Sequence, residues 1–375
     1  SNRAAHMRPL ALAAAVFALA ACAPLPPKPA APAGVIVFPE APDDPRFVYE
    51  RTLYSSADVV ADDREASMRR LLTGEAKGGT RLTKPYAVAV HQGRIFLSDT
   101  VERFVAVFDV PLGRFFRIGE DEAGRLVKPI GLDVDRAGTL YVADATQKTI
   151  MVFDRDGNYL RRIGSEKTFD RLASVTVDPK GERVYVVDIG GVSSENHRVR
   201  VFDARSAEHL FDIGKRGKEP GEFNLPRDLA VGRDGQLYVV DSGNFRVQVF
   251  DARGGFLHAF GSVGKQLGNF ARPKEIAADK DGNVYVVDTA FGNFQIFNAD
   301  GDLLMYVGER SEKDGPAKYM LPSGIYVDED GRVYMVDQWF RKVDIFRPVA
   351  LKPNEGWLGR RPAAKPAPAK AAAGG

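Results

Sequence analysis

Short segments that are rich in β-branched and aromatic side chains, and in which apolar and polar residues often alternate, recur along most of the chain. One kind of run ends in an aspartate and occurs six times: Ile95–Asp99, Leu140–Asp144, Val184–Asp188, Leu237–Asp241, Val284–Asp288 and Val333–Asp337. Successive aspartates are 45, 44, 53, 47 and 49 residues apart. This period is typical of the four-stranded units of β-propellers rather than of helical solenoids.

Three further strands are predicted around each aspartate run. A short strand precedes it, often opened by proline: Pro85–Val90, Pro129–Val134, Leu172–Val177, Pro226–Val231, Pro273–Ala278 and Pro322–Val327. An alternating strand such as Phe245–Phe250, a turn such as Asp251–Gly255 and a fourth strand follow it. Alternation with a period of two, interrupted by turn glycines, specifies antiparallel strands. We therefore expect an all-β, six-bladed β-propeller.

The last unit lacks a fourth strand, because the chain runs into Pro348 after Val343–Phe346. Near the other end, Arg46–Tyr54 has the pattern of a strand but belongs to no unit. Pairing this strand with the last blade would close the ring and remove an exposed edge. Between it and the first unit, Asp58–Leu72 is predicted to form one short helix that ends at Gly74.

The fourth unit carries a more specific motif. It places Gly214, Gly217, Gly221, Phe223 and Pro226 before Leu229-Ala-Val, Gly235-x-Leu-Tyr-Val-Val-Asp241 and Asn244-x-Arg246-Val-Gln-Val-Phe250. Residues 261–297 repeat it nearly in full. The motif closely resembles an NHL repeat, and the resemblance extends in looser form over residues 82–347. Proteins of this kind form six-bladed propellers, so the resemblance implies the fold that the strand count predicts.

The recurring aspartates are predicted to be structural. Each precedes a loop, where its carboxylate can accept hydrogen bonds from loop amides or from a side chain such as that of Arg246. A catalytic residue needs to occur only once, so the positions at which the blades differ are the candidates for function.

One such position is the second residue after the opening position of the innermost strands, which reads Ala87, Gly131, Ser174, Asp228, Glu275 and Gly324. Asp228 and Glu275 are acidic, lie on neighbouring blades and follow Arg227 and Lys274. Side chains that project into the central channel from these positions would form a charged cluster able to hold a cation or a polar ligand. The alternative is an ion-pair network that neutralises itself along a wet channel.

The loops after the aspartates share one rim of the predicted ring. Aromatic and arginine side chains are efficient anchors at protein interfaces. We expect binding through Arg103, Phe104, His197, Arg198, Phe245, Arg246, Phe291, Phe294, Trp339, Phe340 and Arg341. The alternative is that several of these side chains fill the gaps between blades.

Metal-dependent enzymes provide a second class of candidates. Lyases that cleave peptidyl-hydroxyglycine resemble NHL propellers with histidines around a channel metal, and lactonase-like propellers hold calcium. Here His91, His197, His209 and His258 are predicted in a turn, an insertion and outer strands, so no converging set is expected. Asp228 and Glu275 could begin a calcium site, but no further ligands can be named. No cofactor is expected.

The N-terminal residues predict the cellular location of the protein. A single cysteine excludes a disulfide framework. The cysteine is the last residue of the segment Leu19-Ala20-Ala21-Cys22, which follows a basic start and an apolar stretch. This arrangement resembles the signal sequence of a bacterial lipoprotein. The resemblance implies cleavage before Cys22 and lipid attached to it. The predicted parts are upstream residues and signal (1–21), lipidated cysteine and proline-rich tether (22–45), propeller (46–350) and a disordered Ala/Pro/Lys-rich tail (351–375).

Lysine and arginine number 52 and aspartate and glutamate 50, so the chain has no large net positive charge that would favour binding to nucleic acid. The predicted export also argues against an RNA partner. We expect a monomeric, membrane-anchored, non-catalytic propeller that binds another exported protein or an envelope polymer. Ala23, in the place of an aspartate that would favour the inner membrane, indicates the outer membrane of a bacterial cell envelope. A metal-dependent lyase or lactonase-like hydrolase acting in the channel is the alternative.

Overall fold

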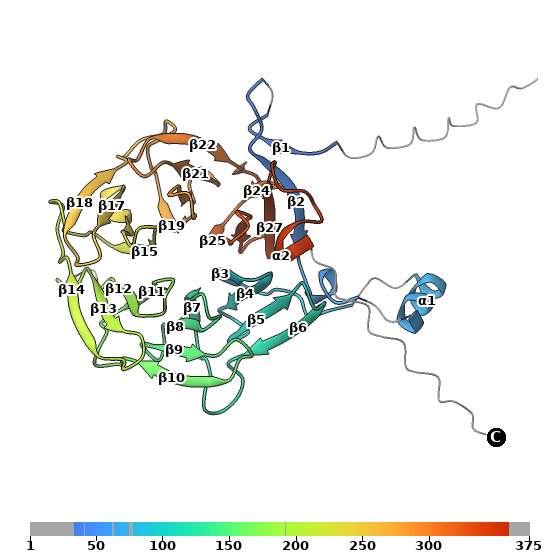
Figure 1. Cartoon of the computed structure of the whole chain (residues 1–375), viewed down its shortest axis with the longest axis horizontal. Helices are drawn as coiled ribbons and strands as arrows, with labels where there is room; N and C mark the ends of the chain where they lie inside the picture. The colour runs from blue at the N-terminus through green and yellow to red at the C-terminus, as the bar shows by residue number, and fades with distance from the viewer. Residues whose placement is uncertain (1–33, 41, 62–63, 75–77, 192, 360–375) are drawn as a thin grey trace, which may run out of the picture. The chain divides into compact units, whose positions relative to one another are not determined.

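Six antiparallel sheets are arranged in a ring around a central axis, which makes the fold a six-bladed β-propeller (Figure 1). This computed structural model describes residues 34–40, 42–61, 64–74, 78–191 and 193–359. The first five blades, from the innermost strand outward, are β3 (Pro85–His91), β4 (Arg94–Asp99), β5 (Phe104–Asp109) and β6 (Arg114–Ile118); β7 (Pro129–Val134), β8 (Leu140–Asp144), β9 (Thr149–Phe153) and β10 (Tyr159–Ile163); β11 (Leu172–Val177), β12 (Arg183–Asp188), β13 (Arg198–Asp203) and β14 (His209–Ile213); β15 (Pro226–Val231), β16 (Leu237–Asp241), β17 (Arg246–Phe250) and β18 (Phe256–Phe260); and β19 (Pro273–Ala278), β20 (Val284–Asp288), β21 (Asn293–Phe297) and β22 (Leu303–Val307).

The sixth blade combines strands from distant parts of the sequence. Its inner strands are β25 (Pro322–Val327), β26 (Val333–Asp337) and β27 (Lys342–Pro348). The fourth strand is β2 (Phe47–Leu53), which pairs antiparallel with β27, and β1 (Val37–Phe38) adds to its outer edge. The prediction that an N-terminal strand closes the last blade is confirmed.

Apolar side chains form a buried layer between every pair of neighbouring blades. Each layer receives one phenylalanine from the same place near the end of a third strand, at most 2% exposed: Phe108, Phe153, Phe202, Phe250, Phe297 and Phe346. Burial of apolar surface contributes roughly 25 cal/mol per Å². These layers hold each innermost strand against the next, and β25 against β3, so the ring is closed.

Short elements connect the blades. η1 (Ser56–Asp58) and α1 (Arg64–Thr73) lead from β2 to β3, and α1 ends at Gly74, whose φ of +70° suits a glycine at the end of a helix. The predicted helix is therefore present, but it begins later than Asp58, which belongs to the separate 3₁₀ turn. The other short elements are η2 (Ser242–Asn244), β23 (Glu309–Arg310) and β24 (Lys318–Tyr319).

The folded body extends past the predicted limits of 46–350. β1 lies within the segment predicted as a tether. After the last blade, α2 (Gly356–Gly359) packs Leu358, 8% exposed, into the layer that joins the first and sixth blades. Cys22 and residues 360–375 lie outside the described residues. Within the described part of the chain, none of the helices has the length and apolar character needed to span a bilayer.

Candidate functional site

Each strand-end aspartate fixes the backbone of its neighbouring loops. Asp99 accepts hydrogen bonds from the backbone N–H groups of Thr83 (2.8 Å) and Lys84 (3.0 Å) before β3, and of Val101 and Glu102 (both 3.1 Å) after β4. Similar bonds, all to carboxylates at most 1% exposed, are made by Asp144, Asp188, Asp241, Asp288 and Asp337. The predicted structural role of these residues is confirmed. We call the side of the ring that carries these loops the aspartate face.

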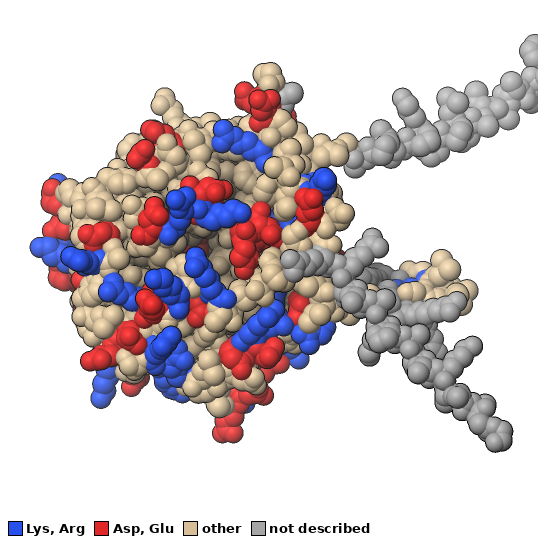
Figure 2. Space-filling view, viewed as in Figure 1, with Lys and Arg blue, Asp and Glu red and all other residues tan. Residues whose placement is uncertain are grey.

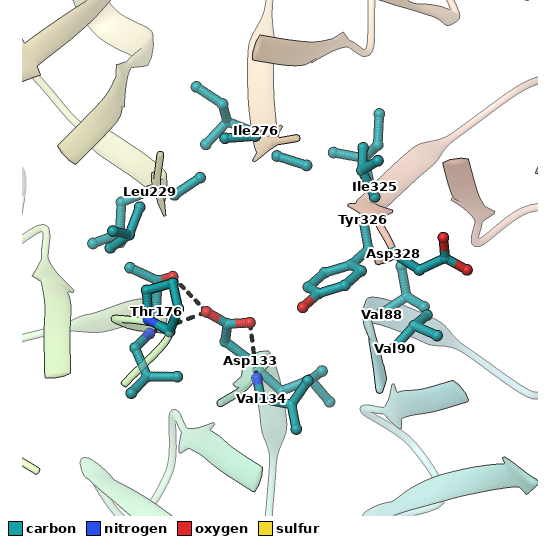
Figure 3. Close-up of a pocket in the computed structure, with 18 of the residues that line it drawn as sticks. Val88, Val90, Asp133, Val134, Thr176, Leu229, Ile276, Ile325, Tyr326 and Asp328 are labelled. Atoms are coloured by element: carbon teal, nitrogen blue, oxygen red, sulfur yellow. Dashed lines mark hydrogen bonds between the residues drawn. The ribbon is translucent and has the colours of Figure 1, made fainter. Parts of the chain in front are cut away.

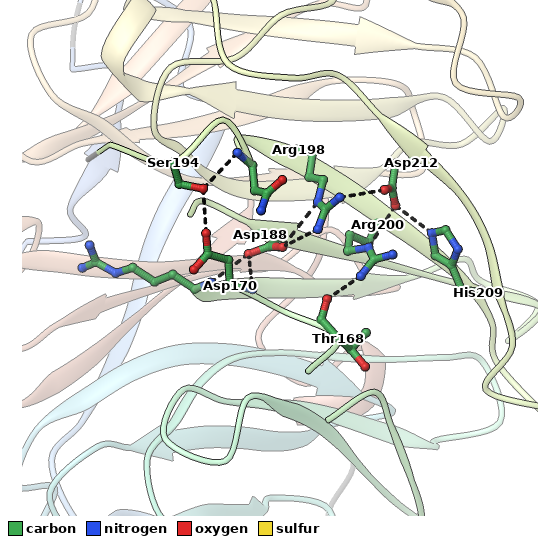
Figure 4. Close-up of polar contacts among 10 residues, drawn as sticks. Thr168, Asp170, Asp188, Ser194, Arg198, Arg200, His209 and Asp212 are labelled. Carbon is green, nitrogen blue, oxygen red and sulfur yellow. Dashed lines mark hydrogen bonds and ion pairs between the residues drawn. The ribbon is translucent and has the colours of Figure 1, made fainter. Parts of the chain in front are cut away.

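The longest of the loops that follow a strand-end aspartate, residues 189–197, is held by contacts of its own (Figure 4). Ser194 donates a hydrogen bond to Asp170 at 2.6 Å. His197 is 1% exposed, and its Nδ1 accepts a hydrogen bond at 3.0 Å from the backbone N–H of Leu225 in the next blade. The structure therefore places His197 between two blades, where it joins them.

Arg198 follows this loop and is also engaged within the molecule. Its guanidinium pairs with Asp188 at 3.3 Å and with Asp212 at 3.1 Å (Figure 4). Arg200 and His209 bind the same Asp212, at 3.0 and 2.7 Å, and together these donors hold the pKa of that carboxyl below its usual value despite its partial burial. Arg198 thus stabilises the third blade.

Three other predicted rim residues lie inside the protein. Phe104 and Phe294 are 3% and 0% exposed and pack in the layers between blades. Phe104 is the first residue of β5 and Phe294 is the second residue of β21, directly after the turn. Their side chains therefore enter the sheet. Arg246 binds Asp241 at 2.9 Å and the carbonyl groups of Glu219 and Glu222, both at 3.0 Å.

The remaining rim residues reach the surface of the aspartate face. Trp339 is 61% exposed, and Arg103 and Arg341 are exposed as well. Phe245, Phe291 and Phe340 are half-buried. Arg103, Phe245 and Arg341 occupy the same position of the turn in their blades and have φ of +63°, +55° and +57°, which directs the chain sharply into the following strand.

A cavity of about 260 Å³ runs along the axis of the ring and is lined by all six innermost strands. Figure 2 shows a hollow at the centre of the ring, with basic and acidic side chains around it. The walls combine apolar side chains such as Leu229, Ile276 and Ile325 with polar ones such as Asp133 and Thr176 (Figure 3). The cavity is therefore a channel of mixed polar and apolar character.

Asp228 and Glu275, the acidic residues singled out in the sequence, both line this cavity. Asp228 is 8% exposed and accepts hydrogen bonds from the Ser174 hydroxyl at 2.6 Å and the Ile276 backbone N–H at 2.9 Å. Burial, followed by the charge of Asp228, raises the pKa of Glu275 well above its usual value. A Cβ at Gly131 would lie 2.3 Å from Ser174 Oγ, so this glycine allows the strands to approach. Burial raises the pKa of Asp228 as well, so both carboxyl groups of the pair bind a proton more readily than a free carboxyl group does.

The predicted basic neighbours lie beyond this pair, towards the aspartate face. Lys274 Nζ lies 4.6 Å from the centre of the Tyr86 ring, a cation–π contact across the ring of strands. Burial lowers the pKa of Lys274, and the nearby charge of Arg227 lowers it further, while Glu275 opposes the shift. Arg227 is exposed. Within the described residues, neither basic group forms an ion pair within 4 Å with Asp228 or Glu275.

The sequence comparison missed a second polar group in the cavity wall. Asp133 accepts hydrogen bonds from the Thr176 hydroxyl at 2.5 Å and from the backbone N–H groups of Val177 and Val134, at 3.0 and 2.8 Å. Figure 3 shows Asp133 and Tyr326 pointing towards the same part of the cavity. Burial raises the pKa of Asp133 to about 6. The signal was present two residues further along each innermost strand, where the other blades carry Ala89, Thr176, Ala230, Ala277 and Tyr326.

The four histidines that the structure describes do not converge. His91 closes β3 and lines the cavity, where its Nε2 lies 3.0 Å from the carbonyl oxygen of Arg136. His197 lies between blades, and His209 and His258 lie in the outer strands β14 and β18. In the part of the chain that the structure describes, no group of three or more His, Cys, Asp or Glu side chains is arranged to hold a metal ion.

Comparison with known proteins places these features in context. The family model described as "NHL repeat" matches residues 223–250. The chain is 28% identical over 114 residues to the probable peptidyl-alpha-hydroxyglycine alpha-amidating lyase pgal-1 of Caenorhabditis elegans, covering 29% of this chain and 31% of that protein. It is 36% identical over 83 residues to NHL repeat-containing protein 3 of Mus musculus, covering 22% and 23%. The chain thus spans less than a third of the length of these relatives.

Among solved structures, a gluconolactonase from Xanthomonas campestris superimposes with a TM-score of 0.55 and 16% identity, covering 80% of this chain and 98% of that one. This likeness concerns the fold. Together with the six antiparallel sheets and the repeat match, it leads to one conclusion: the chain is a six-bladed β-propeller that carries an NHL repeat at residues 223–250.

Proposed function

We propose that this propeller is a non-catalytic binding module whose aspartate face contacts another protein. The observation that carries the proposal is Trp339, a large aromatic side chain that is 61% exposed on a fixed loop. Asp337 accepts hydrogen bonds from the backbone N–H groups of Leu321 at 2.9 Å and Phe340 at 2.8 Å, which ties that loop to the segment before β25. A pre-ordered aromatic side chain loses little conformational entropy when a partner covers it.

The proposal includes a location. The lipoprotein-like sequence ending at Cys22 supports a lipid anchor in a bacterial cell envelope, with the outer membrane favoured by Ala23. The proline-rich residues that follow would serve as a tether, and a monomeric propeller would face another exported protein.

The experiment places a photo-crosslinking residue at position 339 and, as a matched control, at Leu112, which is 53% exposed in the turn between β5 and β6 on the opposite side of the ring. The proposal predicts one reproducible protein adduct from position 339 and none from position 112. With the purified partner, Trp339→Ala should weaken binding about tenfold or more while the thermal midpoint stays unchanged. Equal adducts from both positions, or an unaffected affinity, would refute it.

Chemistry in the cavity is the second candidate function. It is favoured by the buried Glu275, whose pKa is raised well above its usual value by burial and by the charge of Asp228, and by the names of two similar proteins, an amidating lyase and a gluconolactonase. The described residues supply no set of three metal-ligating side chains, so we derive no metal-dependent step. Elemental analysis of the full chain before and after chelation, with the thermal midpoint, tests this candidate. A stoichiometric metal whose removal lowers the midpoint, with lactone hydrolysis abolished by Asp228→Asn, would favour the enzyme.

A further inference from the structure

Six basic residues surround the axis of the ring where the innermost strands begin. They occupy the position just before an innermost strand or the second position within it: Lys84, Lys128, Arg171, Arg227, Arg272 and Lys274. Since the innermost strands contact one another in a closed ring, these residues lie around the aspartate-face end of the channel on five of its six blades, the sixth contributing none. No acidic residue occupies any of the equivalent positions. We call this set the throat ring.

The side chains of the throat ring are not neutralised by the protein. Among the described residues, none of the six forms an ion pair, and five of them are exposed, Lys274 being half-buried. Other bases on the same face are paired, as with Arg246 and Asp241 at 2.9 Å and Lys215 and Glu222 at 3.4 Å. Burial raises the pKa of both carboxyl groups in the pair beneath the ring, which weakens the negative charge that Asp228 and Glu275 set against these bases. Positive charge is therefore concentrated around the axis.

The backbone of the throat ring is fixed. The N–H groups of Lys84, Lys128, Arg171 and Arg272 each donate to a buried strand-end aspartate, at distances of 2.8 to 3.1 Å. The charged side chains therefore start from rigid points, which lowers the entropy that a ligand must overcome.

Two leucines complete the same set of positions. Leu225 and Leu321 stand just before innermost strands, where the other four blades carry lysine or arginine, and they are 38% and 42% exposed. A polymer of phosphate has no apolar group to cover them, whereas a polypeptide has. Positive charge interleaved with exposed leucine indicates a ligand that is acidic and partly apolar.

We propose that the throat ring binds an acidic segment of polypeptide in which apolar residues stand among aspartate and glutamate. The inference rests on the proposed function, because it names the chemistry of the partner that the aspartate face would bind. Binding of this kind weakens as salt concentration rises, since exposed charges are screened.

The experiment measures the fluorescence anisotropy of a labelled peptide that repeats Glu-Asp-Leu, titrated with the full chain. In the test variant Lys128, Arg171 and Arg272 are all replaced by Gln. In the control variant Arg136→Gln, Lys180→Gln and Lys280→Gln remove the same charge from exposed positions at the other end of the channel. We expect the test variant to raise the Kd about tenfold and the control variant less than about twofold. All changed side chains are exposed, so the thermal midpoint should not move.

A second pair of measurements addresses the leucines. Leu321→Ser should weaken binding of the Glu-Asp-Leu peptide but leave binding of a Glu-Asp-Ser peptide unchanged. Tighter binding of inorganic polyphosphate than of the peptide, no peptide binding, or an equal effect of the two triple variants would overturn the inference. Crosslinking at position 339 that survives in such a case leaves the proposed function standing, so the two failures are distinguishable.

Discussion

The fourth and sixth blades are both antiparallel sheets that start from an innermost strand at the axis, but they are held together differently. In the fourth blade Asp241 collects donors from nearby sequence: Asn224 at 2.7 Å, Asn244 at 2.8 Å, Arg246 at 2.9 Å and Gln248 at 3.0 Å. All of its strands follow one another in the chain. The contacts that hold this blade together are therefore local and are made by residues of the repeat itself.

The sixth blade is closed by contacts between residues nearly 300 positions apart. Arg332, fully buried, binds Glu50 of β2 at 2.7 Å, and Thr52 donates to the buried Asp344 at 2.5 Å. Lys342, also fully buried, lies 3.1 Å from Asp344. In the sixth blade, charged groups thus join two segments that are distant in sequence, whereas the strands of each other blade follow one another in the chain. The ring therefore depends most on the pairing of β2 with β27, the contact between strands that are farthest apart in sequence.

The largest effect should come from removing the closing strand. Deletion of residues 46–54 takes away the partner of β27, leaves Arg332 and Asp344 without Glu50 and Thr52, and exposes a long sheet edge. We expect the cooperative unfolding transition to be lost or its midpoint to fall by tens of degrees, measured by circular dichroism. An unchanged midpoint would show that the ring does not need β2.

The next largest effect should come from single charges in the two blades. Glu50→Gln leaves Arg332, 0% exposed, without its main partner, and should lower the free energy of unfolding by about 3 kcal/mol. Its control is Arg246→Gln in the fourth blade, where three other donors still bind Asp241, and about 1 kcal/mol is expected. Denaturant unfolding measures both; equal costs would remove the distinction between local and distant closure.

The smallest effect depends on pH and arises at Asp328 of the sixth blade. Burial raises the pKa of Asp328 to about 7, and the charges of Asp330 and Glu329 add to the shift, whereas the fourth blade has Gly232 at this position. An unfolded aspartate titrates near pH 4. Folding therefore favours the protonated carboxyl, so the stability from this group is full below pH 4 and is lost as pH rises through 7.

The corresponding variant is Asp328→Asn. Relative to the natural chain, its free energy of unfolding should improve by about 2 kcal/mol between pH 5 and pH 8, because only the natural chain pays for a buried charge at the higher pH. The difference between the variants is the quantity to follow, since Asn also alters the bond from Tyr334 at 2.7 Å. A difference that stays constant with pH contradicts the prediction.

Sequence reasoning reached the fold because its signals recur. The aspartates and the alternating strands occur six times, and Arg46–Tyr54 was recognisable as a strand without a partner. The site was harder to predict from sequence. Phe104 and Phe294 are of a residue type that is common at binding sites, and only the geometry of the turn before them decides that they enter the core. Asp133 was missed because the comparison of blades stopped one channel-facing position too early. The pairing of Arg332 with Glu50 leaves no trace in local sequence.

The strand-end aspartates recognise mainly backbone N–H groups, and this has a consequence for engineering. An acceptor that reads only the main chain is indifferent to the side chains between its donors, so loop sequences on this face should be interchangeable. Asp99, Asp288 and Asp337 are acceptors of this kind, because the hydrogen bonds that they accept come from backbone N–H groups, whereas Asp188 and Asp241 also bind arginine side chains. The loops beside Asp99, Asp288 and Asp337 can therefore be regarded as grafting points of a display scaffold.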